Sequence, residues 1–240
     1  MRETLNPKIA LVGLSPASTQ IDAFTRHYAR NGDYGGASVA GAFAGLDADI
    51  LAMLKGLGLS QKLGLDPSLN TLRYHPDIYV TSLVACASLT TSGSSDDFDP
   101  QAYPAAMRCI TQRLVSELSD PRWSQLSTII VFGSKGWDAF RSLRTTSGAT
   151  LLDDLANRGL TVLKLPHPSG QNKEYVQLAA KPPLEFPAKE DYAEAYWQRY
   201  LSSPSKPGRN KQPEQRYKNR RRKVWNSINT LRQQIAELAD

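Results

Sequence analysis

Leu163-Lys-Leu-Pro-His-Pro-Ser-Gly170 is an apolar run that stops abruptly at a polar cluster containing two prolines. A second stretch near the start of the chain, Ile9-Ala-Leu-Val-Gly-Leu-Ser-Pro16, has the same form. This pattern is typical of a buried parallel strand that ends at the sheet edge and delivers polar groups into a crevice. His167 is one of only three histidines, and imidazole suits a site that needs a hydrogen-bond donor near pH 7. A His-Pro turn after a strand is the structural alternative.

The rest of the chain alternates strand patterns with helix patterns. Apolar and β-branched runs predict strands over 8–14, 78–85, 126–132 and 160–165. Apolar residues at helical spacing predict helices over 48–57, 104–118, 137–143, 148–158 and 191–201. The stretch 18–40, rich in Gly, Asn and aromatic residues, is predicted to be a long irregular loop. The alternation predicts a three-layer αβα domain with a mainly parallel, four-stranded central sheet.

The composition narrows the class of protein. The chain has 240 residues, of which 40% are hydrophobic and 22% charged, as in ordinary globular domains. No apolar run reaches the roughly 18 residues of a membrane span, and the N-terminus lacks the order of a signal peptide. We therefore expect a cytoplasmic protein without a membrane contact. Cys86 and Cys109 have no CxxC spacing and no nearby histidine cluster, so we expect no metal, iron–sulfur cluster or other cofactor.

The positive charge of the chain is concentrated near its end. The net charge is +6, yet ten Lys or Arg residues and a single acid lie between Lys206 and Arg232. Residues 206–232 thus carry a net charge of +9 and the last eight residues a net charge of −2. The first 205 residues therefore carry a net charge of only −1. We therefore expect a nearly neutral α/β domain over 1–201, a Ser/Pro/Gly linker over 202–213 and a basic helix over 214–240 that binds a polyanion.

This basic helix also carries a narrow apolar stripe. The stripe consists of Val224, Ile228, Leu231, Ile235 and Leu238, at spacings of 4, 3, 4 and 3. One interpretation is a helix that packs on the body with its charges in solvent, and the stripe also leaves self-association open. We favour contact with nucleic acid because the charge is so concentrated, although DNA, RNA and a protein are all open as partners at this point. The expected phosphate ligands of this helix are Arg216, Arg220, Arg221 and Arg222.

The four predicted strands all end in short polar turns, over 13–17, 88–95, 133–136 and 166–170. In an open α/β sheet these turns line one crevice. Small residues let a phosphate backbone approach closely, and backbone N–H groups and Ser hydroxyls can bind its oxygens. Lys135 and Lys173 would add positive charge.

A serine hydrolase is the main rival to a phosphate-binding crevice. Gly13-Leu-Ser-Pro-Ala17 is a variant of the nucleophile elbow G-x-S-x-G, with acids and His167 later in the chain. In that elbow the residue after the serine supplies a backbone N–H to the oxyanion hole. Here that residue is Pro16, which has no N–H, and this argues against a hydrolase.

Taken together, these stretches resemble the uracil-DNA glycosylase superfamily. That family has a first strand ending in G-x-[D/N/E]-P-[G/Y], a middle strand like V-Y-V-T-N-x-V-K-C, a third strand with a Gly-containing turn into a helix, and a last strand ending in [H/N]-P-S. The matching stretches here are Gly13-Leu-Ser-Pro-Ala17, Ile78-Tyr-Val-Thr-Ser-Leu-Val-Ala-Cys86, Val131-Phe-Gly-Ser-Lys-Gly-Trp137 and Leu165-Pro-His-Pro-Ser-Gly170. Their order and spacing agree over roughly residues 8–180.

The resemblance implies a DNA glycosylase on a uracil-DNA glycosylase-like fold. Such an enzyme flips a nucleotide out of the duplex and breaks its sugar–base bond through an oxocarbenium-like sugar. His167 would donate a hydrogen bond to the departing base. The resemblance further implies a base pocket lined by Leu14, Tyr34 and Ser82. It also implies phosphate contacts from Pro16, Ser134, Ser169 and Gly170, to which Lys135 and Lys173 add charge.

Two departures from the family pattern affect the expected chemistry. Ser15 replaces a carboxylate or Asn, so it can orient a water but cannot act as a carboxylate base; Asp22 and Asp33, in the following stretch, are the candidate acids. Ser82 replaces an Asn that reads the base edge. Both changes suggest a roomier pocket and a bulky modified base, such as a hypermodified cytosine of phage DNA removed in defence. The alternative is a DNA- or RNA-binding protein on the same fold that has lost its catalysis.

Overall fold

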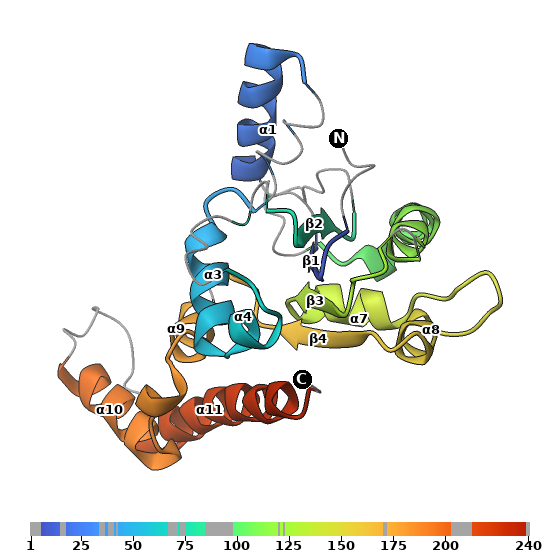
Figure 1. The fold of residues 1–240 in the computed structure, drawn as a ribbon. Coiled ribbons are helices and arrows are strands. Elements are labelled where there is room, and N and C mark those ends of the chain that lie inside the picture. The colour runs from blue at the N-terminus through green and yellow to red at the C-terminus, as the bar shows by residue number, and fades with distance from the viewer. Residues whose placement is uncertain are drawn as a thin grey trace.

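The centre of the protein is a sheet of four parallel strands (Figure 1). The computed structural model describes residues 6–14, 18–33, 37, 41, 43–66, 72, 75–84, 98–119, 121, 123–169, 172–202 and 213–238. The strands are β1 (Ile9–Gly13), β2 (Ile78–Ser82), β3 (Thr128–Phe132) and β4 (Thr161–Leu165), in the order β2-β1-β3-β4. The predicted sheet is confirmed, and each strand lies inside the apolar run that predicted it.

The register of the sheet brings the ends of all four strands to one edge. Gly13 pairs with Ser82, and Phe132 pairs with Leu165, so neighbouring strands end level with one another. The two central strands are buried along their whole length. Because successive side chains of a strand alternate between faces, each strand contributes to two separate cores, one on each face of the sheet.

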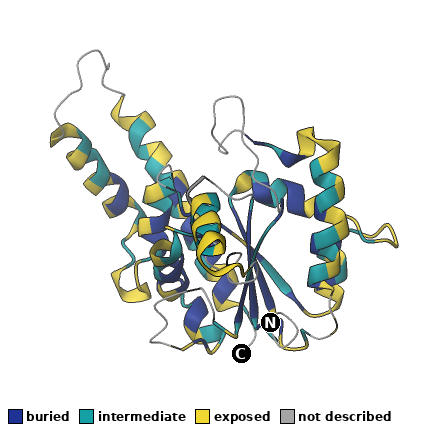
Figure 2. Ribbon diagram, turned by 90° about the horizontal axis from the view of Figure 1, so that it is seen from above, coloured by how far each residue is buried: buried dark blue, intermediate teal, exposed yellow. Residues whose placement is uncertain are grey.

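Helices cover both faces and complete the predicted three layers (Figure 2). One face packs against α3 (Asp47–Gly56), α4 (Leu59–Lys62), α9 (Lys173–Ala179), α10 (Lys189–Ser202) and α11 (Glu214–Ala236). The other packs against α5 (Pro104–Ile110), η3 (Thr111–Val115), α6 (Ser116–Leu118), α7 (Ser134–Arg141) and α8 (Leu151–Asn157). Among the described connections are the 3₁₀ turns η2 (Pro100–Ala102) and η5 (Pro183–Glu185). The predicted helix over 104–118 is confirmed as one continuous helix with a π-helical turn, η3, in its middle.

One prediction about the first connection is wrong. The stretch 18–31, expected as irregular loop, forms the helix α1 (Ser18–Asn31), while 34–36 and 38–40 lie outside the described residues. Phe24 stacks on Tyr28 one turn later, with ring centroids 6.2 Å apart. A Cβ on Gly41 would stand 2.9 Å from the carbonyl oxygen of Gln20, so this glycine lets the chain pack closely on α1. Local stacking and this contact hold the helix, in place of a wide apolar face.

The C-terminal helix α11 packs on the body of the protein. Four of the five residues of its apolar stripe are buried in the same core as residues of β1 and β3: Val224, Ile228, Leu231 and Ile235. The fifth, Leu238, is half-buried and packs against that core. The indole N–H of Trp225 donates to the carbonyl oxygen of Pro187, at 2.8 Å. The stripe therefore faces the body. Within the described ranges, no helix is both long and apolar enough to span a membrane.

Candidate active site

The carboxyl ends of the strands form one continuous edge because the pairing continues beyond them. The amides of Leu83 and Val84 donate to the carbonyl oxygens of Gly13 and Leu14, at 2.8 and 3.0 Å. Between β3 and β4, the amide of Gly133 likewise donates to the carbonyl oxygen of Leu165, at 2.9 Å. The segments that follow the strands therefore start from one end of the sheet. We call this end the strand-end edge; it is formed by the last residues of the four strands, Gly13, Ser82, Phe132 and Leu165.

His167 lies at this edge, packed against Gly133. A Cβ on Gly133 would stand only 3.2 Å from the Cβ of His167. Gly133 has φ +80° and ψ 161°, a backbone conformation that only glycine adopts without strain. The turn after β3 is thus shaped to receive the half-buried histidine from the turn after β4. The predicted proximity of these two turns is confirmed.

The other two histidines have local roles. The Nδ1 atom of His75 accepts the backbone N–H of Asp77, at 3.2 Å, in the turn before β2. His27 lies on α1, where a ring nitrogen is 3.2 Å from the amide nitrogen of Asn31. Of the three, only His167 follows a strand directly at the strand-end edge.

Predicted phosphate ligands follow both Gly133 and His167 in the chain. Ser134 is the exposed first residue of α7, and Lys135 follows it half-buried. Because backbone N–H groups in the first turn of a helix lack intrahelical partners, this turn suits an anion. After β4, the carbonyl and hydroxyl oxygens of Ser169 accept from the backbone and side chain of Asn172, at 2.9 and 3.4 Å. The exposed Lys173 then begins α9.

Phe43 closes the edge over the central strands, a role that the sequence did not reveal. Its ring meets Phe132 edge-on at 5.3 Å between centroids, and a Cβ on Gly13 would stand 3.3 Å from it. The side chain is buried, with 4% exposed. Its φ is +49°, an uncommon value for a residue other than glycine, so packing holds the backbone in a strained conformation here.

The end of β2 is held by a charged clamp. The guanidinium of Arg113 donates to the hydroxyl of Thr81 at 3.0 Å, to the carbonyl oxygen of Leu83 at 2.9 Å and also to that of Ser82. The carboxylate of Glu117 accepts from the same guanidinium at 2.8 and 2.9 Å. Arg113 lies on the π-helical turn η3, and such turns are frequent at functional sites. Nothing in an amphipathic helical pattern distinguishes this arginine from a surface residue.

Ser82, a predicted pocket residue, uses its hydroxyl within the chain. Its Oγ donates to the carbonyl oxygen of Val84, at 2.9 Å. A hydroxyl has a single proton to donate, so in this conformation Ser82 can offer a ligand only its acceptor lone pairs.

The remaining predicted residues are distributed as follows. Leu14 is half-buried just beyond β1, and Asp22 and Asp33 are exposed, the first on α1 and the second just after it. Ser15, Pro16, Tyr34 and Gly170 lie outside the described residues. The described part of the chain holds no group of three or more His, Cys, Asp or Glu side chains placed to bind a metal ion.

The four arginines predicted as phosphate ligands on α11 fall into two groups. Arg216 and Arg220 are exposed. Arg221 forms an ion pair with Glu174 of α9, and burial lowers the pKa of its guanidinium. Arg222 forms an ion pair with Glu190 of α10, with a shortest N–O distance of 2.6 Å.

The model of the uracil DNA glycosylase superfamily matches residues 2–199. The match includes the whole sheet and His167 and ends inside α10, so α11 lies beyond it. No curated protein and no solved structure matches the chain significantly. Because the family match covers most of the chain, the protein belongs to the uracil DNA glycosylase superfamily, a family that acts on DNA and whose general activity is the excision of bases.

Proposed function

We propose that the protein is a DNA glycosylase that binds a flipped-out nucleotide at the strand-end edge and hydrolyses its sugar–base bond, leaving an abasic site. The observation that carries this proposal is the packing of His167 against Gly133 where β3 and β4 end, in a chain of this superfamily. A half-buried imidazole at a fixed position is suited to donate a hydrogen bond to a base as negative charge develops on it.

The residues around His167 would perform the other steps. Flipping a nucleotide costs a few kcal/mol, which phosphate contacts repay. We assign these contacts to four residues that follow the ends of β3 and β4 in the chain: Ser134, Lys135, Ser169 and Lys173. We assign the orientation of the attacking water to Ser15, because an oxocarbenium-like sugar is strongly electrophilic and reacts with a well-placed water. The alternative is that the carboxylate of Asp22 performs this role.

For the substrate, we propose a bulky modified base, such as a hypermodified cytosine of phage DNA. The hydroxyl of Ser82 donates to the carbonyl oxygen of Val84, which leaves it unable to donate to a base edge in that conformation. Serine is also shorter than the asparagine that the family often has there. A short residue turned toward its own chain would leave space for a larger base. On this basis the protein would act in defence against phage.

The test is an abasic-site assay. Duplexes carrying uracil, hypoxanthine, 5-hydroxymethylcytosine or its glucosylated form are incubated with the protein and then cleaved with alkali. We expect strand scission on a modified cytosine, loss of scission in His167→Ala, and full scission in His75→Ala, a matched histidine in the turn before β2. Scission of uracil at an equal rate would reject the modified-base proposal. No scission with intact DNA binding would instead identify a non-catalytic DNA-binding protein.

A further inference from the structure

The cations of α11 are sorted between two faces of the helix. The helix carries seven Lys or Arg residues. Four of them are held by the rest of the protein: Lys218, Arg221, Arg222 and Arg232. The other three, Arg216, Arg220 and Lys223, are exposed and have no acidic partner among the residues that the structure describes.

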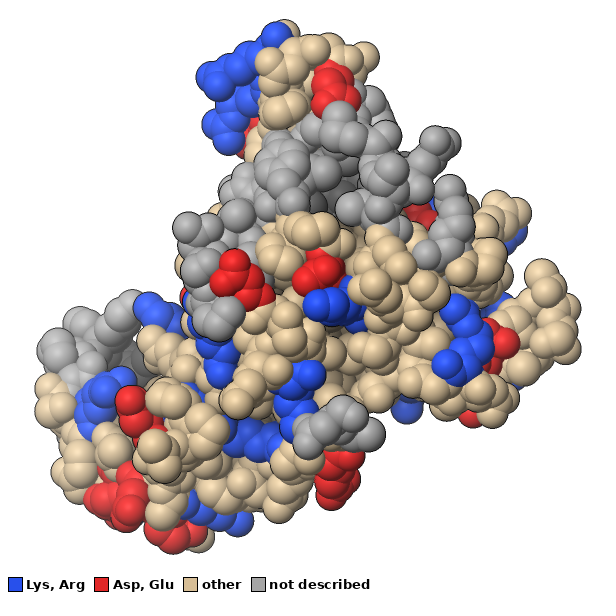
Figure 3. All heavy atoms as spheres, viewed as in Figure 1, with Lys and Arg blue, Asp and Glu red and all other residues tan. Residues whose placement is uncertain are grey.

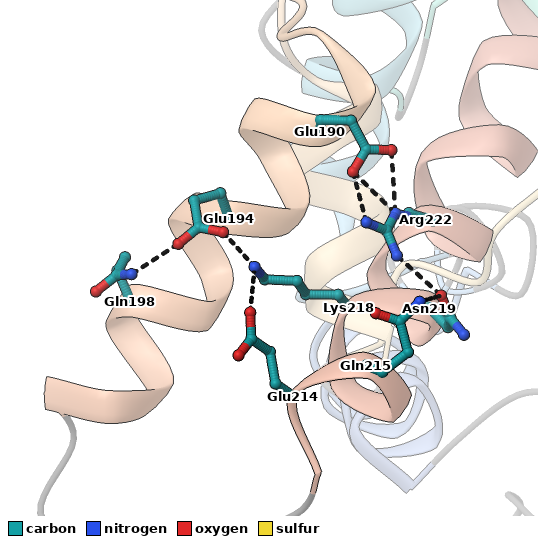
Figure 4. Close-up of polar contacts among 8 residues, drawn as sticks. All are labelled: Glu190, Glu194, Gln198, Glu214, Gln215, Lys218, Asn219 and Arg222. Carbon is teal, nitrogen blue, oxygen red and sulfur yellow. Dashed lines mark hydrogen bonds and ion pairs between the residues drawn. The ribbon is translucent and has the colours of Figure 1, made fainter.

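The paired cations fasten α11 to α9 and α10. Lys218 is ion-paired with Glu194 and, at 2.6 Å, with Glu214, while Arg222 is ion-paired with Glu190 (Figure 4). Over α10 and α11, the face drawn in Figure 3 likewise shows acidic and basic side chains side by side. We call the face of α11 that carries these paired cations the inner face. Its positive charge is largely neutralised, and its cations hold the helix in place.

The three remaining cations form a stripe along the outer face. Arg216, Asn219, Arg220 and Lys223, here called the outer stripe, recur at helical spacing and line a surface groove together with Pro213 and Gln215. The amide oxygen of Asn219 accepts from Arg222 at 2.9 Å and from Gln215 at 3.4 Å, as Figure 4 shows. Its amide N–H groups are left as donors. The outer stripe thus presents only hydrogen-bond donors and positive charge, which is what a phosphate backbone requires.

Contacts between α9 and α11 place the outer stripe near the strand-end edge. Arg221 contacts Glu174, the second residue of α9, and Arg232 donates to the carbonyl oxygen of Lys181, just after α9 ends. The two helices therefore run in the same direction, and α9 begins where the turn after β4 ends. Arg216 precedes Arg221 by five residues, so the helix extends about 8 Å beyond Glu174, away from the amino ends of the strands. In Figure 2 the start of α11 accordingly lies at the opposite end of the molecule from the N and C labels.

The aromatic residues nearby do not offer a platform for unpaired bases. Tyr200 stacks on Tyr217 at 4.6 Å and on Trp197 at 5.5 Å between centroids, and all three are half-buried between α10 and α11. Proteins that bind single strands without sequence preference stack bases on available aromatic rings. Here these rings stack on one another, and the outer stripe itself has none. Phosphate contact alone fits duplex DNA.

We propose that the outer stripe binds the phosphate backbone of duplex DNA on one flank of the nucleotide held at the strand-end edge. The surface lies outside the residues matched by the superfamily, so the match itself does not account for it. Its position on one side of the sheet, fastened by ion pairs, makes the extra contact one-sided. This proposal deepens the proposed function and rests on it for the position of the flipped nucleotide.

The binding surface itself is tested on undamaged duplex DNA, where no catalysis occurs. Fluorescence anisotropy measures the affinity of Arg216→Gln/Arg220→Gln as the salt concentration rises. Because each phosphate contact contributes about 0.9 to the salt slope, we expect the slope to fall by about 2. The matched control is Lys55→Gln/Lys181→Gln, which changes two exposed lysines, one in the last turn of α3 and one just after α9, and should leave the slope unchanged. An unchanged slope in the arginine variant, an equal fall in the control, or a larger fall on single-stranded RNA would overturn the proposal.

The one-sided contact is tested with duplexes that carry a single tetrahydrofuran abasic analogue. Each duplex has a short flank on one side of the analogue and a long flank on the other, and the two arrangements to be compared differ in which side carries the long flank. We expect several-fold tighter binding of one arrangement, and equal binding of the two by Arg216→Gln/Arg220→Gln. Equal binding of both by the unaltered protein would overturn the one-sided placement. If the protein excises no base but the salt slope still falls, the proposed function fails and the surface stands.

Discussion

Gly133 lies so close to His167 that a side chain at position 133 would crowd the histidine: a Cβ there would stand 3.2 Å from the Cβ of His167. The glycine therefore does two things at once. It takes a backbone conformation closed to other residues, with φ +80°, and it leaves room for the imidazole. The proposed leaving-group donor, which follows β4, thus packs against a residue in the turn after a different strand, β3.

We predict that Gly133→Ala impairs base excision more than it impairs stability. The strained backbone should cost about 1–3 kcal/mol of unfolding free energy, and the new methyl group should displace His167. Gly148→Ala is the matched control, since Gly148 also has a positive φ, +85°, but no described atom within 4 Å of the new methyl group. Calorimetry should show similar losses of stability for both variants, and the abasic-site assay should show a loss for Gly133→Ala alone. Equal activities in the two would contradict the role of this contact.

The clamp at the end of β2 gives a second prediction. Arg113→Lys keeps the charge but loses the planar group that reaches Thr81, Leu83 and Glu117 together. We expect a loss of about 2 kcal/mol of unfolding free energy, as for hydrogen bonds to a charged group. Hydrogen exchange should also become faster at the amides of Leu83 and Val84, which pair with the end of β1.

The control for this clamp is Arg108→Lys, on the same continuous helix. Arg108 is exposed, and its side chain makes no hydrogen bond or ion pair within the described part of the chain. Its substitution should change neither stability nor exchange. Unchanged exchange at Leu83 and Val84 in Arg113→Lys would show that pairing with β1 alone holds the end of β2.

The ion pairs of α11 predict a pH dependence for its attachment. Arg222 lowers the pKa of Glu190, and Lys218 lowers that of Glu194, in each case mainly through a hydrogen bond to the carboxylate. A carboxyl whose pKa is lower in the folded state stabilises above its ordinary value and loses that contribution as the pH falls through the folded value. The attachment should therefore weaken below pH 4.5, the ordinary value for both.

Trp225 reports this attachment, because its indole donates to Pro187 and packs against Phe186 at 5.4 Å. Its fluorescence, taken as the difference from Trp225→Phe, should change in the acid range. In Glu190→Gln/Glu194→Gln the acid-dependent change should disappear, with weaker attachment already at neutral pH. An identical transition in both proteins would exclude these two pairs as its cause.

The sheet could be predicted from the sequence because each strand is a short apolar run that ends in a polar turn. Parallel strands buried on both faces need little more than this pattern. The helix α1 could not be predicted in the same way, since its described side chains are half-buried or exposed. Its order depends on a stacked pair, Phe24 and Tyr28, and on contact with Gly41, which follows the helix in the chain.

The candidate site was predicted in part for a similar reason. His167 and Ser134 follow strands directly, so the topology alone places them at one edge. Arg113 and Phe43 depend on contacts with residues 30 or more positions away in the chain, and no local pattern reveals such partners. The basic helix shows the same limit: its charge is plain in the sequence, but the division between Arg220 and Arg222 depends on Glu190, 32 residues from Arg222.

Glu174 has a consequence for how the chain could be divided. It accepts the hydroxyl of Tyr192 at 2.7 Å and pairs with Arg221, so one carboxylate of α9 joins α10 and α11. The apolar stripe of α11 completes the core beside β1 and β3. A single backbone cut between Ser202 and Pro213 would therefore yield two fragments that remain assembled as a nicked protein. Expressed separately, the two pieces should complement each other, whereas the larger piece alone would expose a hydrophobic surface and tend to aggregate.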